Sequence, residues 1–110
     1  MNTPPVLLLR NAMQAYAWRM ESLASNVANL DTPGYDRLEV RFEESLQRAR
    51  RGGPGVAQEV GAEMLQEDRA PVLEDELMAL ADTQMRVQLA TRALHEHFSL
   101  VRTGITGRTG

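Results

Sequence analysis

The feature that most constrains the fold of this chain is a long heptad pattern near its C-terminus. Between residues 73 and 105, a row of mostly apolar side chains recurs at alternating steps of four and three. This spacing aligns the side chains along one stripe of a helix. The stripe comprises Leu73, Leu77, Leu80, Gln84, Val87, Thr91, Leu94, Phe98, Val101 and Ile105. Together with Pro71 in the first turn, the pattern predicts a C-terminal helix over residues 71–104.

A second, shorter heptad pattern lies near the N-terminus. Its members are Leu9, Met13, Tyr16, Met20, Leu23, Val27 and Leu30. The pattern predicts an N-terminal helix over residues 9–31, with Pro4 and Pro5 just outside its start. Pro33 and Gly34 suit the two central positions of a type II turn, because glycine accepts the positive φ required at the second. The chain is therefore expected to leave the helix at this turn.

The segment between the two helices, residues 32–70, has a weaker pattern. Leu38, Val40 and Phe42 alternate with polar residues, and a short amphipathic stretch follows. The sequence "RRGGPG" then breaks the chain. We predict a turn, a short extended or helical segment and a flexible loop, with residues 50–70 as loop or partly disordered. The expected fold is mainly α, a single unit over residues 1–110. Its two long helices pair as an antiparallel coiled-coil-like hairpin around an irregular middle.

The charge balance and the sequence motifs exclude several functions. The 110-residue chain has a net charge of -3, which argues against a nucleic-acid partner. It contains no cysteine, and no nucleophile–base arrangement or phosphate-binding glycine loop is present. His95 and His97 would lie about 200° apart on a helix and could not share a metal. We therefore expect no enzyme activity, no cofactor, no metal and no small-molecule substrate.

The N-terminal region has an apolar patch of only four residues and no basic segment before it. This is too short for a signal peptide or a membrane span. If the protein leaves the cytoplasm, it is expected to use a route that does not require a cleaved leader.

Two paired helices leave much apolar surface uncovered in a chain of this size. Met78, Ala81, Met85 and Leu89 form a second apolar stripe beside the heptad row of the C-terminal helix, and Ala17, Ala24 and Ala28 give the N-terminal helix a smooth face. These faces predict burial against other subunits; alternatively, the middle segment folds back over them. The predicted residues for helix pairing and subunit interface are Met13, Tyr16, Met20, Val27, Leu77, Leu80, Gln84, Met85, Val87, Leu89, Thr91, Leu94, Phe98, Val101 and Ile105.

Polar residues interrupt the C-terminal stripe at Gln84 and Thr91. In coiled coils such positions select the register and the partner, but they can equally lie at the solvated edge of a contact. Two amides, Asn26 and Asn29, are placed near the end of the N-terminal helix. We hypothesise that they hydrogen-bond across to groups near the turn and fix where the chain leaves the helix. The alternative for Asn29 is a local role at the helix end.

The stretch from residue 23 to residue 35 resembles the N-terminal signature of the bacterial flagellar rod, hook and hook-associated proteins. That signature reads Leu-Ala-x-Asn-apolar-Ala-Asn-x-x-Thr-x-Gly-aromatic. The corresponding residues here, with Pro33 included, are Leu23, Ala24, Asn26, Val27, Ala28, Asn29, Thr32, Pro33, Gly34 and Tyr35.

The C-terminal region is similar to the last helix of the FlgB group of proximal rod proteins within that family. The residues that carry this similarity are Gln84, Arg86, Gln88, Leu94, Phe98, Ser99, Arg102 and Ile105. The short chain also fits the FlgB group or the neighbouring FlgC group. One departure is the absence of a polar capping residue before the C-terminal helix, where the chain reads Ala70-Pro71-Val72-Leu73-Glu74. The resemblance covers roughly residues 9–45 and 73–108.

The resemblance implies a structural subunit of the flagellar basal-body rod. Such subunits polymerise into the helical drive shaft that transmits torque from the motor ring to the hook. The implied partners are copies of itself, other flagellar rod proteins, the membrane-embedded motor ring, the adaptor FliE and the type III export gate. The implied location is the periplasmic rod of the basal body, reached without a cleaved signal peptide. The alternative function is a cytoplasmic helical-hairpin adaptor or export chaperone, which would not need the "ANLDTPGY" turn.

Overall fold

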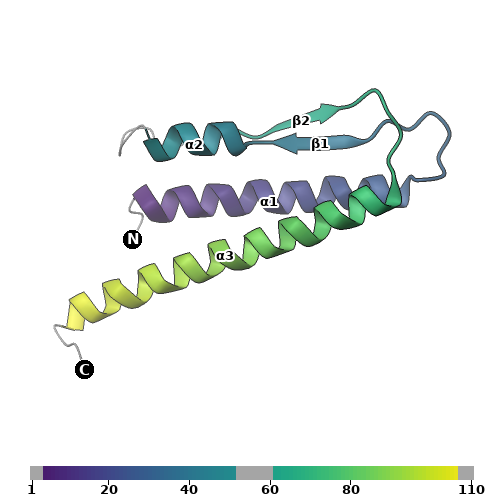
Figure 1. Ribbon diagram of the computed structural model, residues 1–110. Coiled ribbons are helices and arrows are strands. Elements are labelled where there is room, and N and C mark those ends of the chain that lie inside the picture. The colour runs from purple at the N-terminus through teal and green to yellow at the C-terminus, as the bar shows by residue number, and fades with distance from the viewer. Residues whose placement is uncertain (1–3, 52–60, 107–110) are drawn as a thin grey trace.

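The computed structural model describes residues 4–51 and 61–106, and this part of the chain is elongated, with extents of 61 × 29 × 17 Å. In chain order the elements are helix α1 (Pro4–Ala28), strand β1 (Leu38–Arg41), helix α2 (Glu43–Arg51), strand β2 (Glu63–Gln66) and helix α3 (Leu73–Thr106). The two long helices, α1 and α3, pack against each other in opposite directions, as the heptad patterns predicted (Figure 1). Neither is apolar enough to span a membrane over the described residues.

Both long helices differ slightly in extent from the sequence-based expectation. Helix α1 begins at Pro4 rather than at residue 9. Proline is tolerated there because the first N–H groups of a helix have no helical partner. Helix α3 covers residues 73–106, two residues further along than the expected 71–104. Its first helical bond runs from the Glu76 N–H to the Val72 carbonyl, at 3.0 Å.

The middle segment is more ordered than expected where the structure describes it. Strand β2 pairs with β1 in antiparallel register, with Leu38 opposite Gln66 and Arg41 opposite Glu63. The prediction of loop for residues 50–70 is therefore wrong at residues 63–66 and at residues 50–51, which end α2. A four-residue strand carries too little periodicity to be recognised without its partner. Residues 52–60 of the predicted loop lie outside the described residues.

This middle segment covers α1 on the side away from α3 (Figure 1). The core contains two small residues of α1, Ala12 and Ala15, together with Tyr16, Val40 and Phe42. The rings of Tyr16 and Phe42 meet edge to face, with centroids 4.9 Å apart. The apolar faces for which folding back was the alternative are not the ones covered, because Ala17, Ala24 and Ala28 on α1 and Met78, Met85 and Leu89 on α3 are all exposed.

The face that α3 turns inward is rotated from the predicted stripe. Apart from Ala79, its buried or half-buried residues follow steps of four and three and are Glu76, Leu80, Thr83, Val87, Ala90, Leu94, His97 and Val101. The predicted row that contains Leu80, Val87, Leu94 and Val101 is therefore correct. The other predicted row is exposed, and the row that faces inward instead lies one residue earlier along the helix. The exposed residues are Leu77, Gln84, Thr91, Phe98 and Ile105. As helix-pairing residues these five are corrected; as subunit-interface residues they remain predictions.

Candidate functional site

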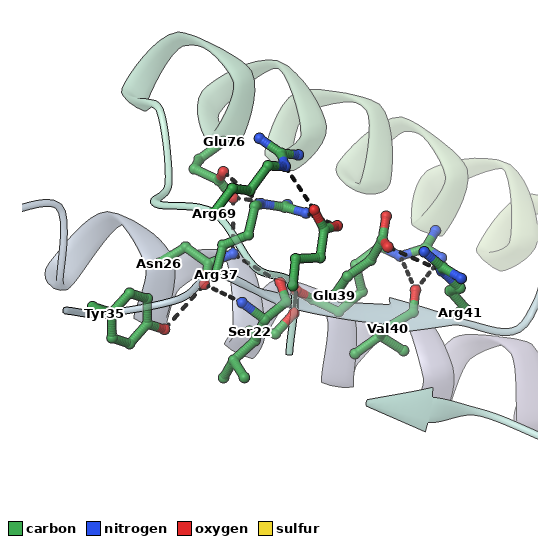
Figure 2. A network of polar contacts seen from close by, with 12 residues as sticks. Ser22, Asn26, Tyr35, Arg37, Glu39, Val40, Arg41, Arg69 and Glu76 are labelled. Atoms are coloured by element: carbon green, nitrogen blue, oxygen red, sulfur yellow. Dashed lines mark hydrogen bonds and ion pairs between the residues drawn. The ribbon is translucent and has the colours of Figure 1, made fainter. Parts of the chain in front are cut away.

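A buried polar cluster joins α1, α3 and the strand pair at the end of the molecule where α1 gives way to the turn (Figure 2). We call it the polar clasp and define it as Asn26, Arg37, Glu67 and Glu76. Asn26 lies on α1, Arg37 directly precedes β1, Glu67 directly follows β2, and Glu76 lies in the first turn of α3.

Asn26 is the centre of the polar clasp. It is fully buried, and its amide nitrogen donates to the Leu38 carbonyl and to Glu76 Oε1, both at 2.9 Å. Its amide oxygen accepts from the Leu38 N–H at 2.8 Å and from the Tyr35 hydroxyl at 3.0 Å. An asparagine side chain offers two donors and two acceptor positions. All four are used here, so one side chain ties three segments together.

Glu76 and Arg37 form the charged part of the polar clasp. Arg37 Nε donates to Glu76 Oε2 at 2.9 Å, and Arg37 Nη2 donates to Glu76 Oε1 at 3.0 Å. The third donor, Nη1, reaches Glu67 Oε1 at 2.7 Å. Glu76 is 0% exposed and Arg37 is 6% exposed. Such a two-pronged pair fixes both side chains in orientation as well as in distance.

The electrostatics of the polar clasp favour its charged state. Burial by itself disfavours the Glu76 carboxylate, but hydrogen bonds from Arg37 and Asn26 and the positive charges of Arg37 and Arg69 outweigh it. They hold the pKa of Glu76 below its ordinary value. The hydrogen bonds to Glu76 raise the pKa of Arg37, against the opposing effect of burial. Removal of either partner would leave the other charge buried.

The turn after α1 brings the chain back so that Arg37 reaches Glu76. Gly34 has φ +75°, and the Tyr35 N–H donates to the Thr32 carbonyl at 3.2 Å. This geometry agrees with the predicted turn with Pro33 and Gly34 at its centre. The Tyr35 hydroxyl, besides its bond to Asn26, lies 3.1 Å from Ser25 Oγ. The turn is therefore anchored on α1 through its aromatic side chain.

Asn29 has a different role from Asn26. Its amide nitrogen donates to the Ser25 carbonyl at 2.8 Å, one helical turn back. Its side-chain oxygen accepts from the Thr32 hydroxyl at 3.0 Å. Both partners belong to the same helix end and turn. The hypothesis of a bridge across the molecule therefore holds for Asn26, whereas Asn29 has the local role that was its alternative.

A second anchor, at Arg19, holds the junction of β1 and α2 against α1. Arg19 Nη2 donates to the Val40 carbonyl and to Glu43 Oε1, each at 2.6 Å. The guanidinium carbon also lies 4.6 Å from the centre of the Phe42 ring. Burial raises the pKa of Glu43, but the hydrogen bond and charge of Arg19 outweigh this and lower it. With Asn26, Arg19 satisfies backbone groups on the edge of β1 that β2 does not pair.

The polar clasp holds elements together through side chains that are paired with one another. A hollow of about 240 Å³ beside the polar clasp is lined in part by Arg19, Arg37 and Asp82, each of which is already in an ion pair. Within residues 4–51 and 61–106, no three acidic, histidine or cysteine side chains group as a metal site. Every buried side-chain nitrogen and oxygen in that part has a hydrogen-bond partner.

The other predicted site residues spread over several environments. Of the motif, Leu23 is buried and Val27 is half-buried, whereas Ala24, Ala28, Thr32 and Pro33 are exposed. Of the predicted interface residues, Tyr16 is buried. Those that are half-buried are Met13, Met20, Val27, Leu80, Val87, Leu94 and Val101. Those that are exposed are Leu77, Gln84, Met85, Leu89, Thr91, Phe98 and Ile105.

Four charged residues that organise the site were not predicted from the sequence: Arg19, Arg37, Glu67 and Glu76. Of these, Glu76 lies one residue before Leu77 of the predicted stripe. One signal could have revealed it, since a row of steps four and three also runs from Glu76 through Leu80 and Thr83 to Val87. That row begins with a carboxylate, which is normally exposed, so apolarity alone favours the row through Leu77.

Comparison with known proteins relates the segment that carries Asn26 and the turn to a family. Residues 7–35 match the family model described as flagella basal body rod protein. The match begins in α1 and ends at Tyr35, and it covers about a quarter of the chain. No curated protein matches the chain. The family match supports the flagellar basal body rod family, a family of structural proteins located in the flagellar basal body.

Proposed function

From the family match over residues 7–35, we propose that this protein is a structural subunit of the proximal part of the flagellar rod. The match supports a rod structural role together with other flagellar rod proteins. The proximal position rests on the similarity of residues 84–105 to the FlgB group and on the short chain. The uninterrupted Asn29–Gly34 region favours the FlgB group over the FlgC group.

The main support for the proposal is the structural role of the segment that matches the family model, residues 7–35. Its Asn26 holds together α1, the start of β1 and α3. A subunit that transmits torque has to keep its helices in a fixed relation while load passes between neighbours. The polar clasp supplies that fixed relation at one end of the molecule. Helices α1 and α3 add small contacts along their length.

The proposal also covers how the subunit is exported and which proteins lie next to it. It is exported by the flagellar type III apparatus without a cleaved signal peptide and assembles in the periplasm. Copies of the chain polymerise into a helical shaft that passes torque from the motor ring to the hook. Its neighbours are other rod proteins, the membrane-embedded ring, the adaptor FliE and the export gate.

Deletion of the gene in the source bacterium tests the proposal. We expect non-motile cells whose isolated basal bodies, viewed by electron microscopy, have the membrane ring but no rod. Complementation with the wild-type chain should restore both, and an epitope-tagged copy should be present in purified basal bodies. Intact rods in the deletion strain would contradict the proposal. A tagged protein found only in the cytoplasm would favour the adaptor or chaperone function instead.

The contribution of the polar clasp can be tested in the same strain. Asn26→Ala should fail to restore motility, because it removes four hydrogen bonds from the clasp. Gln14→Ala is a matched control, because Gln14 is exposed on the same helix and outside the clasp. It should restore motility fully. Equal motility with the two variants would show that the clasp is not needed for the rod.

A further inference from the structure

Helix α3 carries two rows of side chains with the spacing needed to face α1, and only one of them faces inward. We call them the inner row and the outer row. Both rows contain the half-buried residues Leu80, Val87, Leu94 and Val101. Between these shared residues, the inner row adds Glu76, Thr83, Ala90 and His97, whereas the outer row adds Leu77, Gln84, Thr91, Phe98 and Ile105. The helix therefore turns polar and small side chains inward while larger apolar ones stay outside.

Hydrophobic burial alone would favour the outer row. Leu77, Phe98 and Ile105 are 50%, 43% and 72% exposed, whereas Glu76 is fully buried. Removal of apolar surface from water is the main favourable contribution to folding, and a buried carboxylate is unfavourable unless it is paired. In the observed structure Glu76 is paired, because it accepts hydrogen bonds from Asn26 and Arg37. The polar clasp is thus the feature that favours the inner row.

The polar clasp can form in only one rotation of α3. Neighbouring residues of a helix are about 100° apart, and the two rows share every second member, so their midlines differ by about 50°. A rotation of that size would carry the Glu76 carboxylate, roughly 5 Å from the helix axis, by about 4 Å. Its bonds to Asn26 and to Arg37 Nε are 2.9 Å long, and a hydrogen bond does not survive such a displacement.

We propose that α3 has a second packing rotation and that the polar clasp acts as a latch that excludes it. When Glu76 loses its positively charged partners, α3 turns by about 50°, so that Glu76 moves toward solvent and Leu77 moves inward. The shared residues, among them Val87, which packs against the core, face α1 in both rotations. The latch therefore keeps an apolar row on the outside that the chain would otherwise bury. This behaviour belongs to the isolated chain and does not depend on the proposed rod function.

Cysteine labelling of the purified full-length chain measures the rotation, because the chain has no cysteine of its own. Leu77→Cys reports on the outer row. Thr83→Cys reports on the inner row, since Thr83 is 1% exposed. With the polar clasp intact, a maleimide should react quickly at position 77 and slowly at position 83.

The release variant Arg37→Met/Arg69→Met removes the two positive charges that act on Glu76 (Figure 2) and leaves α3 unchanged apart from the reporter cysteine. In this variant, labelling should slow at position 77 and accelerate at position 83, each by about tenfold or more. Slower labelling at position 77 distinguishes a turned helix from a loosened one, because loosening cannot protect an exposed side chain. A release variant in which position 77 stays as reactive as before would overturn the proposal.

A matched control adds Glu76→Leu to the release variant. With an apolar side chain at position 76 no charge has to leave the interior, so both positions should be labelled as in the wild-type background. A turned helix in this control would overturn the proposal, because the buried carboxylate would not be the cause of the rotation. Circular dichroism checks that every variant remains helical, and labelling is done on dilute protein that sedimentation velocity shows to be monomeric.

A second variant keeps the proposal falsifiable if the release variant does not fold. Gln84→Leu/Thr91→Leu makes the outer row apolar throughout and leaves the polar clasp intact. The latch should still hold α3, so the labelling rates at positions 77 and 83 should match those of the wild-type background. Protection at position 77 together with faster labelling at position 83 would overturn the proposal, because apolar burial would then set the rotation despite the clasp.

Discussion

The two halves of α3 differ in the buried contacts that fix them to the rest of the chain. From Leu73 to Val87 the helix contains two buried polar side chains, Glu76 and Thr83, and Glu76 is bonded to α1 and to the segment before β1. Between residues 88 and 105 no side chain is buried. The first half is therefore fixed to the rest of the chain by buried polar contacts, whereas the second half has no buried side chain. Substitutions in the two halves should accordingly change the stability by different amounts, and this difference can be tested.

The largest effect on stability is expected from the buried charge of the first half. Glu76→Ala leaves Arg37 buried with only Glu67 as a partner, so the free energy of unfolding should fall by about 3–5 kcal/mol. Glu74→Ala is the matched control, since its carboxylate is exposed in the same helical turn and should cost about 0.3–1 kcal/mol. Urea unfolding followed by circular dichroism measures both. Equal losses would break the comparison, because they would mean that burial in the clasp adds nothing.

Lowering the pH should weaken the Arg37–Glu76 ion pair. The resulting loss of stability should be smaller than the loss caused by Glu76→Ala. The folded-state pKa of Glu76 lies below its ordinary value of 4.5. The pair therefore stabilises the fold above about pH 4.5, and this contribution is lost as the pH falls from there through the folded pKa. Glu67 and Glu43 shift in the same direction, so the wild type should lose stability through several groups.

The Glu76→Gln variant isolates the share of that one carboxylate. The difference in unfolding free energy between wild type and Glu76→Gln should be largest at pH 7 and should shrink between pH 5 and pH 3. Urea titrations at each pH give both values. A difference that stays constant down to pH 3 would contradict the assignment of the lowered pKa to Glu76.

The next effect concerns the two amides at the end of α1. Asn26→Ala should lower the free energy of unfolding by about 1–3 kcal/mol, because the Leu38 backbone groups lose their partner. Asn29→Ala should cost less, about 0.5–1.5 kcal/mol, because its partners lie near solvent in the turn. Thermal unfolding of both variants tests this order. The reverse order would mean that Asn29 at the helix end contributes more to stability than Asn26 in the polar clasp.

A smaller pair of effects, with opposite signs, is expected at two glycines. Gly34→Ala should cost about 1–2 kcal/mol, since an L side chain is strained at φ +75° although nothing lies within 4 Å of the added methyl group. Gly104→Ala should stabilise α3 by about 0.5–1 kcal/mol, since the position is helical and equally open. Melting temperatures of the two variants give the signs. Equal signs would contradict the local backbone argument.

The smallest effect on stability is expected in the tail of α3. Leu100→Ala should change the free energy of unfolding by less than about 0.5 kcal/mol, because Leu100 is 74% exposed. A large loss of stability would show that the tail is held within the monomer, which would break the distinction between the two halves.

Local patterns predicted the elements that depend on neighbouring residues. The heptad steps located α1 and α3 to within a few residues, and Pro33–Gly34 located the turn where Gly34 has positive φ. The backbone conformation of a turn and the periodicity of a helix are set within a few residues along the chain. For that reason a single sequence suffices for them. Strand β2 was not predicted because it forms by pairing with β1, which lies far from it along the chain.

The rotation of α3 and the composition of the polar clasp were decided by tertiary structure alone. The pattern admitted two stripes on α3, one with Leu77 and one with Glu76, and apolarity favoured Leu77. A carboxylate is buried only if donors surround it, because an unpaired buried charge is costly. For Glu76 those donors, Arg37 and Asn26, lie 39 and 50 residues away along the chain. The fold brings them together, and their contacts turn Glu76 inward and leave Leu77 exposed.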